Sequence, residues 1–84
     1  MKHTANPSFW ESYDALPAEI QALADKNFEL LKTNPRHPSL CLKKVGQYWS
    51  VRVGRKYRAV AVEFEDYLVW FWIGTHTEYD QIIR

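Results

Sequence analysis

The spacing of the hydrophobic residues changes once along this chain, and the change restricts the folds that it can adopt. Before Pro35 the apolar residues recur every three or four positions, which is typical of one face of an α-helix. After Leu40 apolar and polar residues alternate, which is typical of a half-buried β-strand. At 84 residues the chain is expected to form one domain, residues 1–84, of the α+β class.

Two helices are predicted before Pro35, joined at Leu16–Pro17 as an antiparallel hairpin. Pro7 suits the first turn of the first helix, where Ser8 and Glu11 have the spacing of a capping box. The second helix ends at Asn34–Pro35. The apolar residues expected to face the core are Phe9, Trp10, Tyr13, Leu16, Ile20, Leu23, Ala24, Phe28 and Leu31.

A sheet of four antiparallel strands is predicted to follow, with the two helices on one of its faces. The last strand, Tyr67–Ile73, is apolar throughout and is expected to be central and covered on both faces. An additional short strand is allowed at Lys2–Ala5. The other predicted strands cover residues 40–45, 49–53 and 57–64, and the turns between strands fall at Gly46, at 54–56 and at 65–66.

The segment Gln47–Arg58 concentrates positive charge and aromatic rings. It contains four cations, three rings and no acid. It lies within a longer stretch, Arg36–Arg58, that has seven cations and no Asp or Glu, although the formal net charge of the chain is only +1. Such segregation of charge indicates an anionic partner for the middle of the chain. The alternative is a solvated face of the sheet.

Two arginines of this segment are candidates for phosphate binding. Alternation along the strand places Arg52 opposite Trp49, and therefore away from the helices if they cover the Trp49 face. Arg58 follows the turn and is expected near Arg52 on the next strand, where two planar guanidinium groups are suited to a phosphate. Cations interleaved with rings fit single-stranded nucleic acid. The residues expected to widen this surface are Lys43, Lys44, Arg55, Lys56 and Tyr57.

A short C-terminal group, His76, Tyr79 and Asp80, offers groups that can exchange protons. A histidine titrates near neutral pH and can act as an acid or a base, although a lone histidine is more often structural. Tyr79 is expected to donate a hydrogen bond or stack, and Asp80 to orient His76 or pair with a cation. In RNA the 2′-hydroxyl can attack its own phosphorus, so the protein need only align it, move protons and stabilise charge.

The sequence predicts no metal site, no cofactor and no membrane-spanning helix. His3, His37 and His76 are scattered, carboxylates do not cluster at ligand spacing, and no glycine-rich phosphate loop is present. The single cysteine, Cys41, excludes an intrachain disulfide and is expected to be a small core residue. A reducing cytoplasm fits this composition.

Four stretches together resemble the RelE/ParE superfamily of bacterial type II toxins, and the likeness covers nearly the whole chain from Pro7 onward. The resemblance implies a helix hairpin packed on an antiparallel sheet, in agreement with the fold predicted above. The stretches that carry it are Asn34–Leu40, Leu42–Gly46, Tyr48–Arg58 and Trp70–Asp80.

The resemblance also implies a function and a set of residues. RelE-like members cut messenger RNA, usually in the ribosomal A site, by metal-free attack of the 2′-hydroxyl, and a cognate antitoxin wraps and neutralises them. Arg52 and Arg58 fall at the family's strand arginines, and His76 and Tyr79 at its C-terminal His/Tyr region. The leading hypothesis is therefore a cytoplasmic, ribosome-associated mRNA endoribonuclease with these four catalytic residues. Two alternatives stay open: a ParE-like toxin that poisons DNA gyrase or acts otherwise without cleavage, and a chain whose cations mainly meet an acidic antitoxin segment.

Overall fold

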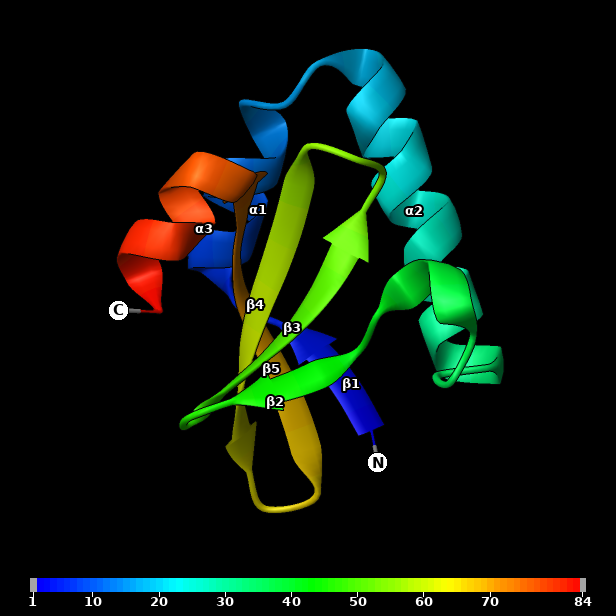
Figure 1. Ribbon diagram of the computed structural model, residues 1–84, viewed down its shortest axis with the longest axis vertical. Coiled ribbons are helices and arrows are strands. Elements are labelled where there is room, and N and C mark those ends of the chain that lie inside the picture. The colour runs from blue at the N-terminus through cyan, green and yellow to red at the C-terminus, as the bar shows by residue number, and fades with distance from the viewer. Residues whose placement is uncertain (1, 84) are drawn as a thin grey trace.

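The computed structural model describes residues 2–83, which form one five-stranded sheet with helices on both of its faces (Figure 1). Two helices precede the main strands and a third follows them, as the change in hydrophobic spacing predicts for the first two. In chain order the elements are β1 (Lys2–Ala5), α1 (Pro7–Asp14), α2 (Ala18–Thr33), a 3₁₀ turn (Pro38–Leu40), β2 (Lys43–Val45), β3 (Tyr48–Val53), β4 (Tyr57–Phe64), β5 (Tyr67–Thr75) and α3 (His76–Ile82).

The sheet has the strand order β1-β5-β4-β3-β2. Strands β2 to β5 form the predicted antiparallel meander, and the optional N-terminal strand exists as β1, which pairs with β5 in parallel. The prediction that Tyr67–Ile73 is the central strand is wrong, because β5 ends the meander and only β1 lies beyond it. The centre of the sheet is β4, whose Val60 and Ala61 are completely buried.

A β-bulge in β5 decides which of its side chains reach the core. Val60 pairs with Trp72 and Ala61 with Trp70, so Phe71 is an extra residue between two pairs. Trp70 and Ile73 are therefore both buried in the core cluster although they are three positions apart. A strict alternation would have turned one of them to the other face.

The first helix begins two residues earlier than the predicted capping box requires. Asn6 is the N-cap, and its side chain accepts a hydrogen bond from the backbone N–H of Phe9 at 3.1 Å. The Ser8 hydroxyl instead donates to the backbone carbonyl of Phe71 at 2.7 Å. Ser8 thus ties α1 to β5, and its predicted role in a box with Glu11 is wrong.

The helices α1 and α2 lie on the same face of the sheet, as predicted, but they are spread apart there. The first packs mainly on β5 and the second on β3. Two hydrogen bonds bridge them: Tyr13 Oη donates to Asp25 Oδ1 at 2.8 Å, and Gln21 Nε2 donates to the Tyr13 carbonyl at 3.0 Å. As a result Trp10 and Phe28, expected in the core, are 50% and 37% exposed.

The chain between α2 and β3 differs from the predicted strand over residues 40–45. Leu40 is buried at the end of the 3₁₀ turn, and β2 begins only at Lys43. Cys41 has a φ of 49°, in the left-handed region, and this conformation turns its side chain to the surface. The prediction that Cys41 is a core residue is therefore wrong.

Candidate nucleic-acid interface

Arg52 and Arg58 lie directly opposite each other on neighbouring strands. The register pairs Arg52 of β3 with Arg58 of β4, and Arg58 in turn with Gly74 of β5. Val51 and Val53 point to the helix-covered core, so both arginines point to the other face, as strand alternation predicts. Like charges directly opposite each other destabilise a sheet. We call Arg52 and Arg58 together the arginine row. Their mutual repulsion favours an anion between the two guanidinium groups.

Neither arginine has an acidic partner within the part of the chain that the structure describes. No Asp or Glu of residues 2–83 lies within 4.0 Å of either guanidinium. Arg58 Nη1 donates to the Tyr57 carbonyl at 3.0 Å, and Arg52 Nη2 lies 3.9 Å from Cys41 Sγ. Both side chains are half-buried, which restricts their motion. Their positive charges have no neighbouring carboxylate within residues 2–83 to neutralise them.

The two lysines of β2 lie on opposite faces of the sheet. Lys43 pairs with Ser50 and so shares the face of Arg52. Lys44 pairs with Trp49 and lies 3.5 Å from the carboxylate of Glu63. The Trp49 indole N–H donates to the same carboxylate at 2.6 Å and lowers its pKa, with Lys44 as a smaller cause. The structure thus brings Lys43 to the arginine row and places Lys44 on the other face.

The turn between β3 and β4 carries the remaining predicted cations. Arg55 and Lys56 are exposed, and Gly54 provides the positive φ of 66° that the turn needs. With Tyr57, Thr75, His76 and Thr77 they line a hollow of about 380 Å³. Tyr57 is half-buried and packs against the core cluster as well as lining this hollow.

His76 is exposed at the start of α3 and is held beside this turn. Its backbone N–H donates to the Lys56 carbonyl at 2.7 Å. Its Nδ1 lies 3.4 Å from Asp80 Oδ2, one helical turn further along α3. A carboxylate at Nδ1 orients an imidazole and leaves Nε2 for a substrate. The structure thus places Asp80 beside His76, which is one of the two arrangements that the sequence analysis allows for this acid.

Tyr79 points into the protein, toward the face of the sheet that carries Arg52 and Arg58. It is 4% exposed, and its hydroxyl donates to Ser50 Oγ at 3.1 Å. Ser50 is itself 1% exposed. The Tyr79 ring lies 5.8 Å from the His76 ring, so the structure keeps these two residues together, but the Tyr79 hydroxyl is used inside the protein.

The helix α3 was missed by the sequence analysis, although a local signal for it exists. Thr75 and Glu78 form a capping box, with Glu78 N–H donating to Thr75 Oγ1 at 3.3 Å and Thr75 N–H to Glu78 Oε1 at 3.0 Å. The Thr75 backbone N–H lowers the pKa of the Glu78 carboxyl, which keeps this acid ionised. The Thr-x-x-Glu spacing predicts a helix start immediately after β5.

Residues 2–83 contain neither a metal-ligating cluster nor a membrane-spanning helix. No three His, Cys, Asp or Glu side chains there gather closely enough to hold a metal ion. Within the same residues, no helix combines the length and the apolar character needed to cross a bilayer.

Comparisons with known proteins agree with this architecture. A family model of the ParE-like toxin domain matches residues 20–81. No curated protein sequence matches the chain. Among solved structures, the RelB–RelE antitoxin–toxin complex from Methanococcus jannaschii aligns with a TM-score of 0.71 at 17% identity, over 95% of this chain and 98% of that chain.

Two further structures show the same fold. A YoeB/ParE toxin from Agrobacterium tumefaciens has a TM-score of 0.66 at 18% identity, over 90% of this chain and 99% of that one. The isolated RelE toxin from E. coli has a TM-score of 0.63 at 10% identity, over 96% and 94%. At these identities the likeness establishes the arrangement of the helices and strands.

Proposed function

The chain belongs to the RelE/ParE family of type II toxin–antitoxin toxins, with a ParE-like toxin domain, and we propose that it acts by cleaving messenger RNA. The arginine row is the observation that carries this proposal. Arg52 and Arg58 are paired across two strands, half-buried and without an acidic partner in residues 2–83. A scissile phosphate between them would relieve their repulsion and gain bidentate contacts.

The reaction we propose is attack by the RNA on itself. The 2′-hydroxyl loses its proton to Nε2 of His76, and its oxygen bonds to the adjacent phosphorus. The bond from phosphorus to the 5′-oxygen then breaks, and that oxygen takes a proton from solvent. The products are a 2′,3′-cyclic phosphate and a 5′-hydroxyl. Arg52 and Arg58 stabilise the charge that develops on the phosphorane, and Asp80 keeps His76 oriented.

Cleavage by purified protein tests the proposal. We expect Arg52→Ala and Arg58→Ala each to reduce the rate about a hundredfold, or roughly 3 kcal/mol of transition-state stabilisation. Primer extension on messenger RNA from a translation reaction locates the cleavage sites. The cleavage rate of the His76→Ala variant is measured in the same assay. Lys44→Ala is the matched control, because Lys44 is a sheet cation on the other face. Undiminished cleavage by the Arg52/Arg58 double variant would overturn the proposal.

A second candidate function, inhibition of DNA gyrase, is suggested by the match to a ParE-like family model. Because the matching model is ParE-like, inhibition of DNA gyrase is the alternative to cleavage. In that case the cations would hold a protein or DNA surface, and no RNA cut would appear. A supercoiling assay with purified gyrase separates the two, since inhibition without cleavage supports the alternative.

We further propose that a protein antitoxin neutralises this chain. The similar RelE of Methanococcus jannaschii was crystallised with its antitoxin RelB. Here Trp10 and Phe28 leave apolar surface exposed on so small a domain, and such surface usually marks a protein partner. Co-expression with the product of the adjacent gene should restore growth and yield a stable complex on gel filtration.

A further inference from the structure

Aromatic side chains gather on the face of the sheet that carries the arginine row, toward the opposite end of the strands. Alternation along β3 places Tyr48 on the same face as Arg52, and the register extends this surface across β4 and β5. All of its side chains are at least partly exposed. The residues of this surface, which we call the ring patch, are Tyr48, Val62, Phe64, Tyr67, Val69 and Phe71.

The ring patch lies beyond the part of this face that α3 covers. In residues 2–83, α3 is the one helix on this face, and Figure 1 shows it near one end of the sheet, with the β4–β5 turn at the other. Ser50 and Val60 are paired across β3 and β4 and are buried, whereas the next pair on this face, Tyr48 and Val62, is partly exposed. Exposed apolar surface of this kind usually marks a binding site.

Two rings of the patch lean toward each other across β4. The ring centroids of Tyr48 and Phe71 are 5.9 Å apart, and the ring planes are tilted by 50°. Phe71 is the extra residue of the β5 bulge, and a bulge can re-aim a side chain. Because the rings are tilted, they do not cover each other's faces. Each ring therefore keeps a surface on which a planar group can stack, as the unpaired bases of single-stranded RNA do.

The strands supply only positive charge to this face. Lys2 pairs with Tyr67 and Lys43 with Ser50, so two lysines join the arginine row there. Within residues 2–83 the one acid in a strand is Glu63, and it pairs with the core residue Leu68 on the other face.

This charge favours an anionic ligand over a second copy of the chain. Two copies docked by the ring patch would bring like charges together. A nucleic acid strand instead offers phosphates to the cations and bases to the rings.

We propose that the ring patch stacks the unpaired bases of a single-stranded RNA whose phosphates lie on the arginine row. Tyr48 and Arg52 are four positions apart on β3, or about 13 Å, which a few nucleotides of an extended strand can span. The ring patch thus positions the nucleotides that flank the cleaved phosphate. The stacking rests on the ring patch alone, and its place beside a cleaved phosphate rests on the proposed function.

Three matched 2′-O-methyl oligonucleotides test the proposal. The first is an unstructured single strand, the second has the same backbone without bases at its central positions, and the third is the first strand in a duplex. Fluorescence anisotropy should show the first binding at least tenfold more tightly than either of the others. The abasic strand keeps every phosphate, and the duplex covers its base faces. Binding by charge alone would instead favour the duplex, whose phosphates are more closely spaced.

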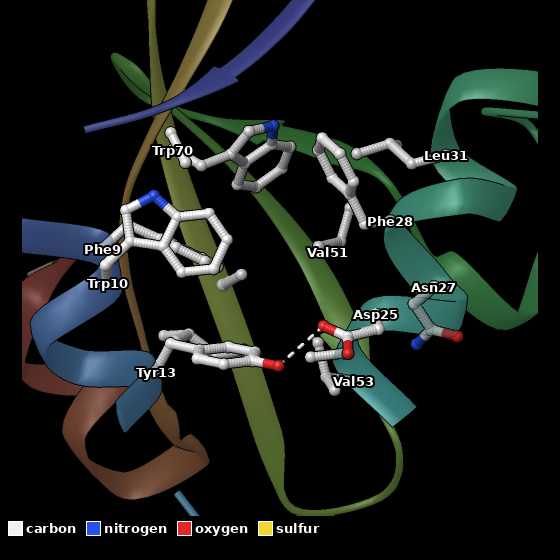
Figure 2. Close-up of a pocket in the computed structure, with 14 residues that line it drawn as sticks. Phe9, Trp10, Tyr13, Asp25, Asn27, Phe28, Leu31, Val51, Val53 and Trp70 are labelled. Carbon is white, nitrogen blue, oxygen red and sulfur yellow. Dashed lines mark hydrogen bonds between the residues drawn. The ribbon is translucent and has the colours of Figure 1, made fainter. Parts of the chain in front are cut away.

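Variants of the two rings locate the stacking. Tyr48→Leu and Phe71→Leu keep an apolar side chain but remove the ring, and each should weaken binding of the first strand about tenfold. Neither should change the slope of log affinity against log salt, because that slope reports phosphate contacts. Tyr48→Trp should retain the affinity. Phe28→Leu is the matched control, because this ring is 37% exposed beside the pocket between α1 and α2, on the other face of the sheet (Figure 2).

Two further variants keep the test decisive. If the leucine variants do not fold, Phe64→Ala takes their place, because Phe64 is 64% exposed and lies outside the core cluster. It should also weaken the first strand and spare the abasic one. The Arg52→Ala/Arg58→Ala variant should lower the salt slope by about 1.4 and keep the preference for the strand with bases, whatever its effect on cleavage. Failure of the proposed function therefore does not imitate failure of this inference.

Three outcomes would overturn the inference. The first is equal binding of the strands with and without bases. The second is a preference for the strand with bases that Tyr48→Leu, Phe71→Leu and Phe64→Ala all leave unchanged. The third is a dimer, or a complex with a protein partner, that these variants dissociate while RNA binding stays the same, because a protein would then occupy the ring patch.

Discussion

The Tyr79 hydroxyl donates a hydrogen bond to Ser50 Oγ inside the protein, 29 positions away along the chain. Tyr79 comes from α3 and Ser50 from β3, so this bond fastens the last helix over the face of the sheet that carries the arginine row. Both residues are at most 4% exposed. A buried hydroxyl pair of this kind holds α3, and with it His76, in a fixed position.

Tyr79→Phe should destabilise the fold while leaving the cleavage chemistry intact. The substitution leaves the buried Ser50 hydroxyl without its partner, which costs about 1–3 kcal/mol. Urea denaturation measures the loss. The double-mutant cycle with Ser50→Ala should show that the two substitutions are not additive, because they remove the same bond. A hundredfold loss of cleavage at unchanged stability would instead make Tyr79 catalytic.

Gly54→Ala should cost more stability than Gly46→Ala. Both glycines have positive φ values, 66° and 61°, so each substitution meets backbone strain of about 1–2 kcal/mol. A Cβ at Gly54 would also lie 2.8 Å from Leu23 Cδ2 of α2, whereas a Cβ at Gly46 meets no atom within 4 Å. Leu23 must therefore move only in the first variant. Equal unfolding free energies for the two variants would contradict this contact.

Stability should fall as the pH is lowered below about 6.5, through His3. Burial lowers the pKa of His3 from its ordinary value of 6.5, and its Nδ1 accepts a hydrogen bond from the Trp70 indole at 3.2 Å. Between the lowered pKa and 6.5 the unfolded chain binds more protons than the folded one. The stabilisation is thus complete above 6.5 and is lost as the pH falls toward the folded pKa, by at most about 1.4 kcal/mol per pH unit.

Urea midpoints at pH 7.5 and 5.5 measure this effect. His3→Gln is the informative variant, because its amide oxygen can accept the Trp70 hydrogen bond without titrating. The variant should lose most of the pH dependence in this window. An identical fall in both proteins would assign the dependence to other groups.

Lys43→Gln should weaken binding to single-stranded RNA, and Lys44→Gln should not. The two residues are neighbours on β2, but only Lys43 shares the face of Arg52, while Lys44 is paired with Glu63. Loss of one phosphate contact should reduce the slope of log affinity against log salt by about 0.7. Titrations of a 2′-O-methyl oligonucleotide, which resists 2′-hydroxyl attack, give both slopes. A smaller slope for Lys44→Gln alone would place the RNA on the helix face.

The sequence was sufficient for those parts of the fold that local patterns determine. The helices before Pro35 and the strand β4 follow from hydrophobic spacing, and the turn at Gly54 follows from its glycine. The position of Arg52 on the face away from α1 and α2 follows from simple alternation in β3. Each of these features depends on residues close together in the chain.

The missed features depend on contacts between distant residues. The parallel pairing of β1 with β5 and the bulge at Phe71 are set by partners that no local pattern specifies. The spacing of α1 from α2 likewise depends on which strand each helix packs against. Tyr79 looked available for chemistry because nothing in the sequence indicates that its partner is Ser50. The start of α3 is the exception, since Thr75 and Glu78 carry its signal locally.

The pairing of β1 with β5 also bears on how the chain folds during synthesis. His3 and Trp70 are hydrogen-bonded although they are 67 positions apart. During synthesis β1 leaves the ribosome well before β5 and must wait for it, and closing so long a loop is slow and entropically costly. The nascent chain cannot complete its sheet until β5 has emerged. A partner present during translation can thus meet the chain before it has folded.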